Sequence, residues 1–441
     1  MIVMSSRVID GESEETVKDA VRSPAPRAPH FRPVLLGSDL GTYSLARAFH
    51  ETYGIKPLVV ASSPRGPING SSIIDVEYSD ASRGHAGLVE VLLEIADRHG
   101  QTPLLLLACG EDHLDAIEEH FDTLNTRFLL PHPRPEITRL GRDKTALYRA
   151  CAQLGIPCPA LTEVALGDLA RGADGQLEVS VPESLRFPLV VKPANSGAWS
   201  TLSFPGKKKA ESVADLGELR ATLTRARNAG YEDVMVVQEL IPGDDTWGRT
   251  VTCYVASDGR MTMASSGVLL LGMHTPSMIG NSVAILTEPQ PELVAEVERI
   301  AAHLGLWGFI NVDLKVHPRD GVARVLDLNA RIGRPNHYVT VSGLNPARAV
   351  TEDLVADGEA PVQEHSTAGV FSYVPKWLLL RYVLDPALKR RVRAAWRASN
   401  PDPLVYALDR NIRRELYRLA ATANVVQRFL HRYPRPSMTG F

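Results

Sequence analysis

The chain has 441 residues, a formal net charge of −3 at pH 7, and 44% hydrophobic and 22% charged residues. This length suffices for two to four domains, and the near-neutral charge gives no reason to expect a nucleic-acid partner. No apolar run reaches the roughly 18 residues that a membrane span requires. The four cysteines form no CxxC pair, so we expect neither a zinc site nor a disulfide framework. This cysteine usage fits a protein of the reducing cytoplasm.

The N-terminal part begins with 30 residues that are acidic and then proline-rich, for which we expect a disordered tail without a signal peptide. Residues 31–137 alternate strand and helix patterns, which is typical of a parallel α/β unit. Its first turn, GSDLG at 37–41, can offer helix N-terminal amides to a ligand but lacks the GxGxxG pattern of a dinucleotide site. Strands are expected at 33–38, 57–62, 72–78 and 103–110, and helices at 42–54 and 87–100.

Two further units are expected at 138–240 and 241–375, where the pattern changes. The first is predicted to hold a helix from 138 that ends at Gly155, then a buried strand, a small-residue turn and a second strand within 188–204, a polar helix at 211–229 and a strand at 233–240. The second is predicted to hold strands at 250–256 and 261–271, a helix at 291–305, a β-hairpin, a helix at 346–357 and a strand at 368–374.

The last part, 376–441, is basic, with fourteen Lys or Arg against four Asp or Glu. Helical patterns at 376–384, 386–398 and 403–431 predict helices that pack on the rest of the protein, or on a second copy in a homo-oligomer. An alternative is contact with anionic precursors or the inner membrane surface through aromatic side chains interleaved with arginines. The side chains concerned are Trp377, Trp396, Phe429, Arg390, Arg391, Arg393 and Arg397.

An acidic β-hairpin is the most informative feature. Two alternating runs, 308–317 and 323–331, flank the turn signal PRDG. Its strands would bring Asp313, Asp327 and Asn329 side by side, and two carboxylates with an amide oxygen suit Mg²⁺. The alternative is a hairpin whose acids face solvent. Just beyond it, the candidate site residues Arg331 and Arg334 offer forked donors for a carboxylate or an acyl phosphate.

Two lysines and an acidic turn point to a nucleotide. Lys144 starts a predicted helix and Lys192 ends a predicted buried strand, and a compact ammonium suits a phosphate oxygen. Taken alone, Lys144 could equally be an exposed helix lysine. The segment VVQELIPGDD at 236–245 runs from a strand into a turn whose backbone could recognise adenine, and Asp244 or Asp245 could accept from ribose hydroxyls.

Together these motifs resemble the ATP-grasp superfamily, and within it the D-aspartate ligases of peptidoglycan cross-bridge synthesis. The resemblance covers residues 31–357 and rests on segments that include LLACGED, VVKPANS, VVQELIPGDD, PSMIGN, GFINVDLKVHPRDG and DLNARIGR. It implies an α/β ATP-grasp fold: a parallel α/β pre-ATP-grasp domain at 31–137, a central lid domain at 138–240, and a catalytic domain with an antiparallel sheet at 241–375. The basic helical extension at 376–441 carries no ATP-grasp motif.

The resemblance also implies roles for the motif residues. Lys144 and Lys192 would bind the α- and β-phosphates of ATP, with Lys192 also near adenine, and Arg331 would stabilise an acyl phosphate. Asp327 stands where the family usually has Glu. Because the side chain of Asp is shorter, its carboxylate could bridge two metal ions only if the ions lay closer to the backbone of the strand. The remaining implied roles are the adenine hinge (Gln238, Glu239, Leu240), the ribose acceptor (Asp245) and the ligands of two Mg²⁺ ions, for which Mn²⁺ can substitute (Asp313, Asp327, Asn329).

The implied activity starts with phosphorylation of the side-chain carboxylate of D-aspartate by ATP. The side-chain amine of a UDP-linked muramyl peptide then attacks the acyl phosphate, and ADP and phosphate are released. Another small amino acid could be the acid, and a non-catalytic nucleotide-binding scaffold is a second alternative, which the presence of both lysines and both acids disfavours. We expect a cytoplasmic protein, with peripheral contact to the inner membrane face as the alternative role of the tail.

Substrate contacts are also expected around this site. Candidate clamps for the α-carboxylate of the amino acid are Arg331, Arg334 and Arg348, and Ser38 and Asp39 are candidates for its ammonium group. The loops 193–200 and 203–210 are candidate lids that exclude water, although the lysine run at 207–209 is expected to be solvated. His337 is expected to be a packed side chain rather than a base.

Overall fold

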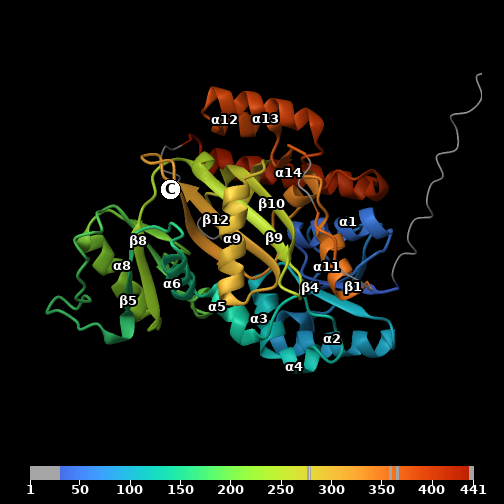
Figure 1. The fold of residues 1–441 in the computed structure, drawn as a ribbon, viewed down its shortest axis with the longest axis horizontal. Helices are drawn as coiled ribbons and strands as arrows, with labels where there is room; N and C mark the ends of the chain where they lie inside the picture. Colours follow the sequence, from blue (N-terminus) through green and yellow to red (C-terminus); the bar gives the residue numbers. More distant parts are fainter. Residues whose placement is uncertain (1–29, 276–277, 279, 357–359, 364–366, 437–441) are drawn as a thin grey trace, which may run out of the picture.

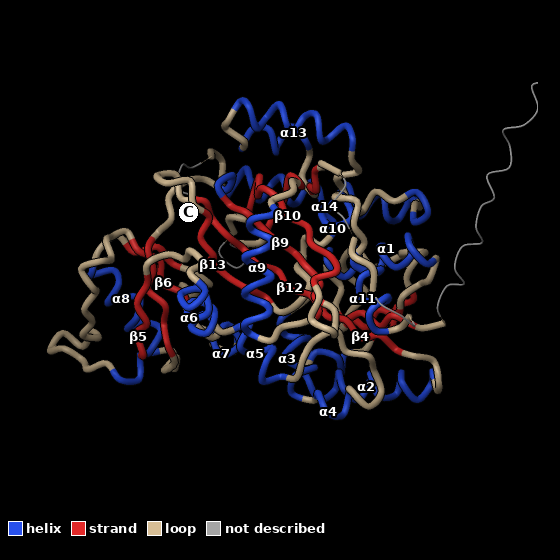
Figure 2. Tube along the Cα trace, viewed as in Figure 1, coloured by secondary structure: helices blue, strands red, loops and turns tan. Residues whose placement is uncertain are grey.

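The computed structural model describes residues 30–275, 278, 280–356, 360–363 and 367–436. The expected disordered tail falls outside the described residues up to position 29, as does part of the PSMIGN motif. Three sheets form the protein: a parallel one, a small antiparallel one and a large antiparallel one (Figures 1 and 2). The predicted layout of a parallel α/β unit, two antiparallel sheets and a helical end is therefore confirmed.

The N-terminal unit is a four-stranded parallel sheet in the order β3-β2-β1-β4. Because the strands are parallel, the turns after β1 and β4 lie at one edge of the sheet, where α1 and α3 begin. Asp39 caps α1 by accepting a hydrogen bond from the Thr42 N–H. The elements are β1 (Arg32–Leu36), α1 (Leu40–Tyr53), β2 (Leu58–Ala61), β3 (Asp75–Tyr78), η1 (Asp80–Arg83), α2 (His85–His99), β4 (Leu104–Ala108), α3 (Glu111–Glu119) and α4 (Phe121–Leu124).

The small sheet has the order β5-β8-β6-β7 and is antiparallel. Its strands are β5 (Leu161–Ala165), β6 (Leu189–Pro193), β7 (Glu211–Val213) and β8 (Val234–Glu239), with η2 (Leu166–Asp168) after β5. Two predictions were wrong here. The small-residue turn after β6 contains the short helix α7 (Ser196–Ser200), and residues 202–210 form no strand. The polar helix, α8 (Leu216–Asn228), starts later than expected because the residues before it pair with β6 as β7.

The predicted single helix ending at Gly155 is in fact two helices. They are α5 (Pro135–Arg142) and α6 (Lys144–Leu154). Asp143 between them has extended backbone, and its carboxylate accepts a hydrogen bond from the Thr145 N–H at 2.8 Å. This cap starts a second helix and places Lys144 in its first turn.

The large sheet has the order β13-β12-β9-β10-β11-β14. The predicted β-hairpin is confirmed as the antiparallel pair β12–β13, whereas β11 was not predicted. Helix α9 lies along one face of this sheet (Figure 1). The elements are η3 (Asp245–Trp247), β9 (Gly248–Val255), β10 (Met261–Gly272), β11 (Ser282–Thr287), α9 (Pro291–Leu304), β12 (Gly308–Val316), β13 (Ala323–Asn329), α10 (His337–Val341), α11 (Pro346–Leu354) and β14 (Val370–Ser372).

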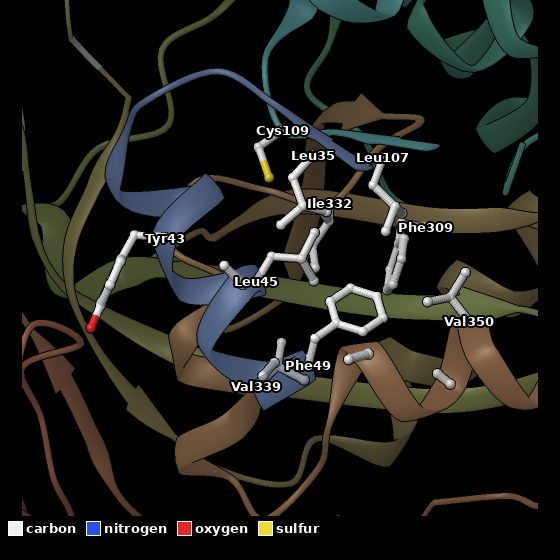
Figure 3. Packing of buried hydrophobic residues seen from close by; sticks show 14 of the residues in the cluster. Leu35, Tyr43, Leu45, Phe49, Leu107, Cys109, Phe309, Ile332, Val339 and Val350 are labelled. Carbon is white, nitrogen blue, oxygen red and sulfur yellow. The ribbon is translucent and has the colours of Figure 1, made fainter. Parts of the chain in front are cut away.

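The N-terminal unit and the large sheet share one hydrophobic core. Leu45 and Phe49 of α1 pack with Phe309 of β12, Val339 of α10 and Val350 of α11 (Figure 3). At the start of α1 the backbones come close, since a Cβ atom added to Gly41 would lie 3.0 Å from the Cα of Arg334. This close approach holds the first turn of the parallel unit beside the DLNARIGR segment.

The basic tail packs on the body, as one alternative predicted. Helices α12 (Lys376–Tyr382), α13 (Pro386–Ala398) and α14 (Ile412–Arg432) share a core with β10, β11 and β14, and η4 (Ala407–Asp409) precedes α14. Phe429 is only 3% exposed, so it is not available for the alternative contact with a membrane. In the described parts of the chain, no helix is long and apolar enough to span a bilayer.

Candidate active site

The acidic hairpin forms one wall of the site. In the β12–β13 ladder Asp313 lies opposite Asp327, and Asn311 lies opposite Asn329. Residues two apart on a strand, and directly opposite residues on its neighbour, share one face of a sheet. The Asn311 amide donates to Asp313 Oδ1 at 3.4 Å and accepts from the Thr252 hydroxyl at 2.7 Å. The structure therefore brings together the three predicted metal ligands.

The two carboxylates differ in pKa. Burial raises the pKa of Asp313 to about 6, and the negative charge of Asp327 adds to this shift. Burial also opposes ionisation of Asp327, but the ammonium groups of Lys144, Lys209 and Lys192 outweigh it and hold its pKa at about 2. The raised pKa of Asp313 means that its charge is poorly compensated by the protein. A bound cation would compensate it, and this oxygen donor set fits Mg²⁺.

The raised pKa of Asp313 predicts a pH dependence. Binding of ATP with Mg²⁺ is expected to weaken by about tenfold per pH unit below about 6, because a proton competes for the carboxylate.

The effect of the same proton on folding stability has the opposite sign. The ligand-free protein gains stability from this proton at low pH and loses it as the pH rises from the ordinary pKa of 3.8 through about 6. Nucleotide titrations and thermal unfolding at several pH values, with Asp313→Asn as the non-titrating control, check both signs.

The two predicted phosphate lysines converge on Asp327. Lys144 is buried, which excludes the exposed alternative, and its Nζ lies 3.1 Å from Asp327 Oδ1. Lys192 donates to the Leu326 carbonyl oxygen at 3.3 Å. Burial lowers the pKa of Lys192 to about 8, and the nearby charge of Lys144 contributes to this shift. Both side chains thus present positive charge at neutral pH beside the acidic hairpin, where an anionic phosphate chain would be attracted.

A cavity of about 240 Å³ lies between the small and the large sheet. Eight of the eleven predicted site residues line it, namely Lys144, Lys192, Gln238, Glu239, Leu240, Asp245, Asp313 and Asp327. A second, wider cavity of about 780 Å³ adjoins it, and Asn329 lines that one together with Lys144 and Asp327. Arg331 and Arg334 line neither cavity.

The hinge and the acidic turn are partly engaged by protein partners. The Tyr148 hydroxyl donates to Gln238 Oε1 at 3.0 Å, so the side-chain oxygen of Gln238 is engaged within the protein. Asp245 Oδ2 accepts from the Gly272 N–H at 2.8 Å and lies 3.0 Å from His274 Nε2. Neither Tyr148 nor His274 was among the predicted site residues.

The candidate arginine clamps do not act as one group. Arg331 Nε donates to Glu111 Oε1, at the start of α3, at 2.7 Å. Arg334 Nε lies 3.4 Å from Asp39 Oδ2. Arg348 pairs with Glu352 on the surface of α11. Arg331 and Arg334 therefore connect the hairpin to the parallel unit at the edge of the site, whereas Arg348 lies away from it.

Comparison with known proteins decides the family. Residues 142–335 match the ATP-grasp domain family. Over 408 residues the chain is 32% identical to the D-aspartate ligase of Enterococcus faecium (strain Aus0004), and this match covers 90% of the chain and 96% of that protein. The chain belongs to the ATP-grasp family. It is therefore an ATP-dependent carboxylate–amine ligase.

Solved structures support the ATP-grasp fold of this ligase. The L-amino acid ligase of Bacillus licheniformis matches with a TM-score of 0.52 and 18% identity, over 74% of each chain. The biotin carboxylase of Campylobacter jejuni matches with a TM-score of 0.56 and 13% identity, over 77% of this chain and 74% of that one. At such low identities the likeness concerns the fold alone.

The lysine run of this ATP-grasp ligase lies beside the two cavities. Lys207 donates to the Leu202 carbonyl oxygen at 2.6 Å, and Lys208 lies 3.6 Å from Glu211. Lys209 instead lines both cavities, and its charge lowers the pKa of Asp327. Lys208 and Lys209 are exposed, as expected for a solvated run, and all three lysines line the second cavity, while Lys209 also lines the first.

Replacement of Lys209 with Ala is expected to lower ligase turnover by about ten- to a hundredfold, because it removes a cation that lines both cavities close to Asp327. Lys208→Ala is the matched control in the same loop, and its pairing with Glu211 predicts a much smaller effect. Steady-state ADP release at saturating ATP measures both variants. Equal losses in the two would show that the loop needs charge in general rather than Lys209 in particular.

His337 behaves as predicted, as a packed side chain. Its ring is buried, and its Nε2 lies 3.3 Å from the Asn400 carbonyl oxygen. Burial lowers the pKa of this imidazole to about 3. It therefore stays neutral at physiological pH and supports the contact between α10 and the tail.

Proposed function

We propose that this ATP-grasp ligase activates the side-chain carboxylate of D-aspartate and joins it to the side-chain amine of a UDP-linked muramyl peptide. The observation that carries the proposal is the 32% identity over 96% of the length of a D-aspartate ligase. The convergence of two lysines and two aspartates on one cavity supports ATP as the activating substrate.

In the first step a carboxylate oxygen of the amino acid attacks the γ-phosphorus of ATP, and the bond from that phosphorus to ADP breaks. Lys144 and Lys192 would hold the phosphates against the acidic hairpin, and Lys192 would draw charge toward the leaving ADP. Mg²⁺ held by Asp313, Asp327 and Asn329 would neutralise charge on the transferred group, and Mn²⁺ could substitute. The backbone from Gln238 to Leu240 would recognise adenine, with Asp245 on the ribose; these roles come from the family resemblance.

In the second step the amine attacks the acyl carbon, the bond to phosphate breaks, and the amine loses a proton to solvent. Arg331 and Arg334 would stabilise the acyl phosphate, for which each would have to turn from its acidic partner, Glu111 or Asp39, toward the substrate. The loops 193–200 and 203–210 adjoin both cavities and would exclude water from the acyl phosphate.

We place this reaction in the cytoplasm, because the proposed acceptor is a UDP-linked precursor. The four cysteines are free thiols, which fits a reducing compartment. Peripheral contact with the inner membrane face would rest on Trp377 and the arginines of α13, since Phe429 is buried. Sedimentation with anionic vesicles would test that contact, and light scattering would test for a homo-oligomer.

The deciding experiment measures ADP release by the purified protein with ATP, Mg²⁺ and UDP-muramyl pentapeptide, with single amino acids added in turn. Release that requires both D-aspartate and the peptide, with a product heavier by one aspartyl unit, supports the proposal. Release with another acid keeps the chemistry and replaces the substrate. ATP binding without release for any acid would contradict the proposed acid and acceptor.

A further inference from the structure

The end of the basic tail reaches the nucleotide cavity. Tyr433 directly follows α14, and its ring stacks on that of His274 with centroids 3.6 Å apart and planes inclined by 7°. Tyr382 of α12 stacks on Tyr433 in turn, at 5.2 Å and 13°, and its hydroxyl donates to the Tyr433 carbonyl oxygen. Three aromatic rings from separate parts of the chain therefore form one stack beside the cavity.

His274 connects this stack to the predicted ribose acceptor. Its side chain lines the cavity and is only 10% exposed, and its Nε2 lies 3.0 Å from Asp245 Oδ2. The Gly272 N–H donates to the same oxygen at 2.8 Å. Among the described residues no hydrogen bond engages Asp245 Oδ1, so this oxygen remains available to a ligand hydroxyl.

We infer that Tyr433 is a positioning residue for nucleotide recognition and acts through His274 on Asp245. The stack fixes the plane of the imidazole, and the imidazole with the Gly272 amide fixes one carboxylate oxygen, so the other is held ready for the ribose. A preoriented acceptor binds a hydroxyl without the cost of ordering its own side chain. The tail, which lies outside the matched ATP-grasp domain at 142–335, thus completes the nucleotide site.

This inference rests on the role of Asp245 proposed above, and it is tested by binding rather than ligation. Affinities of the full-length protein for ATP and for 2′,3′-dideoxyATP are measured by calorimetry, without an amino acid. Tyr433→Ala is expected to weaken ATP binding by about fivefold and to leave dideoxyATP binding unchanged. His274→Phe, which keeps a ring for the stack but removes the hydrogen bond, is expected to give the same pattern.

Two controls separate this role from general packing. Tyr433→Phe keeps the ring and is expected to rescue ATP binding. Trp377→Ala removes an aromatic side chain of the same tail that lies outside the stack and is 57% exposed. Equal losses for both nucleotides in Tyr433→Ala and His274→Phe would overturn the inference, because a loosened fold affects both ligands. If the wild type binds ATP no more tightly than dideoxyATP, the proposed ribose role of Asp245 is wrong. If the wild type prefers ATP and neither variant reduces that preference, only the inferred role of Tyr433 is wrong. Should Tyr433→Ala unfold, His274→Phe decides alone.

Discussion

Replacement of Asp327 with Ala is expected to lower ligase turnover by about a thousandfold while nucleotide binding remains measurable. The change removes one of the two paired carboxylates, the one that forms an ion pair with Lys144 at 3.1 Å. Lys144 and Lys192 would still attract phosphates, so the affinity for ATP alone is expected to hold or increase. Transfer of the phosphoryl group, which needs the cation site, is expected to fail.

Asp320→Ala is the matched control for this prediction. Asp320 belongs to the turn of the same hairpin, and its carboxylate pairs with Arg324 at 2.7 Å, away from both cavities. Its loss is expected to leave turnover nearly unchanged. Asp327→Glu restores the residue that the family usually has, and its retained turnover would show that the shorter acid is a tolerated variant. Normal turnover in Asp327→Ala would contradict a catalytic role for the hairpin.

The hairpin could be predicted from sequence because its evidence is local. Strict alternation over both strands, with a turn signal between them, determines which side chains share a face. Asp313, Asp327 and Asn329 follow from that register without knowledge of the rest of the fold. Asp143 caps α6 and separates it from α5, but this cap was not predicted, so the pattern indicated one helix where the structure has two.

Other parts of the site depend on contacts that no local pattern records. Three consecutive lysines have the same charge, and only the folded loop determines that all three line the second cavity while Lys209 alone also lines the first. Arg331 could be predicted as a cation near the substrate, but its pairing with Glu111 joins residues 220 positions apart. The stack of Tyr433 on His274 likewise joins the tail to a loop of the large sheet. Such contacts follow from the assembled tertiary structure.

Asp409 shows the largest structural effect of this kind, because it anchors the tail to the N-terminal unit. Its carboxylate is fully buried and accepts from the Tyr43 hydroxyl at 2.8 Å, the Ser71 hydroxyl at 2.8 Å and the Ser72 N–H at 2.6 Å. It also forms an ion pair with Arg414 at 3.0 Å, and the Arg414 guanidinium lies over the Tyr43 ring at 4.5 Å. One side chain thereby joins η4 and α14 to α1 and to the segment before β3.

Asp409→Ala is expected to lower the free energy of unfolding by about 3–5 kcal/mol, because Arg414 would remain buried without its partner. Asp385→Ala is the matched control in the same tail. It removes the cap of α13, in which Asp385 accepts from the Ala387 N–H at 2.9 Å, and should cost about 1 kcal/mol. Denaturant unfolding measures both. A loss for Asp409→Ala no larger than that of the control would mean that the tail is held by its apolar core alone, and that the buried ion pair contributes no net anchoring.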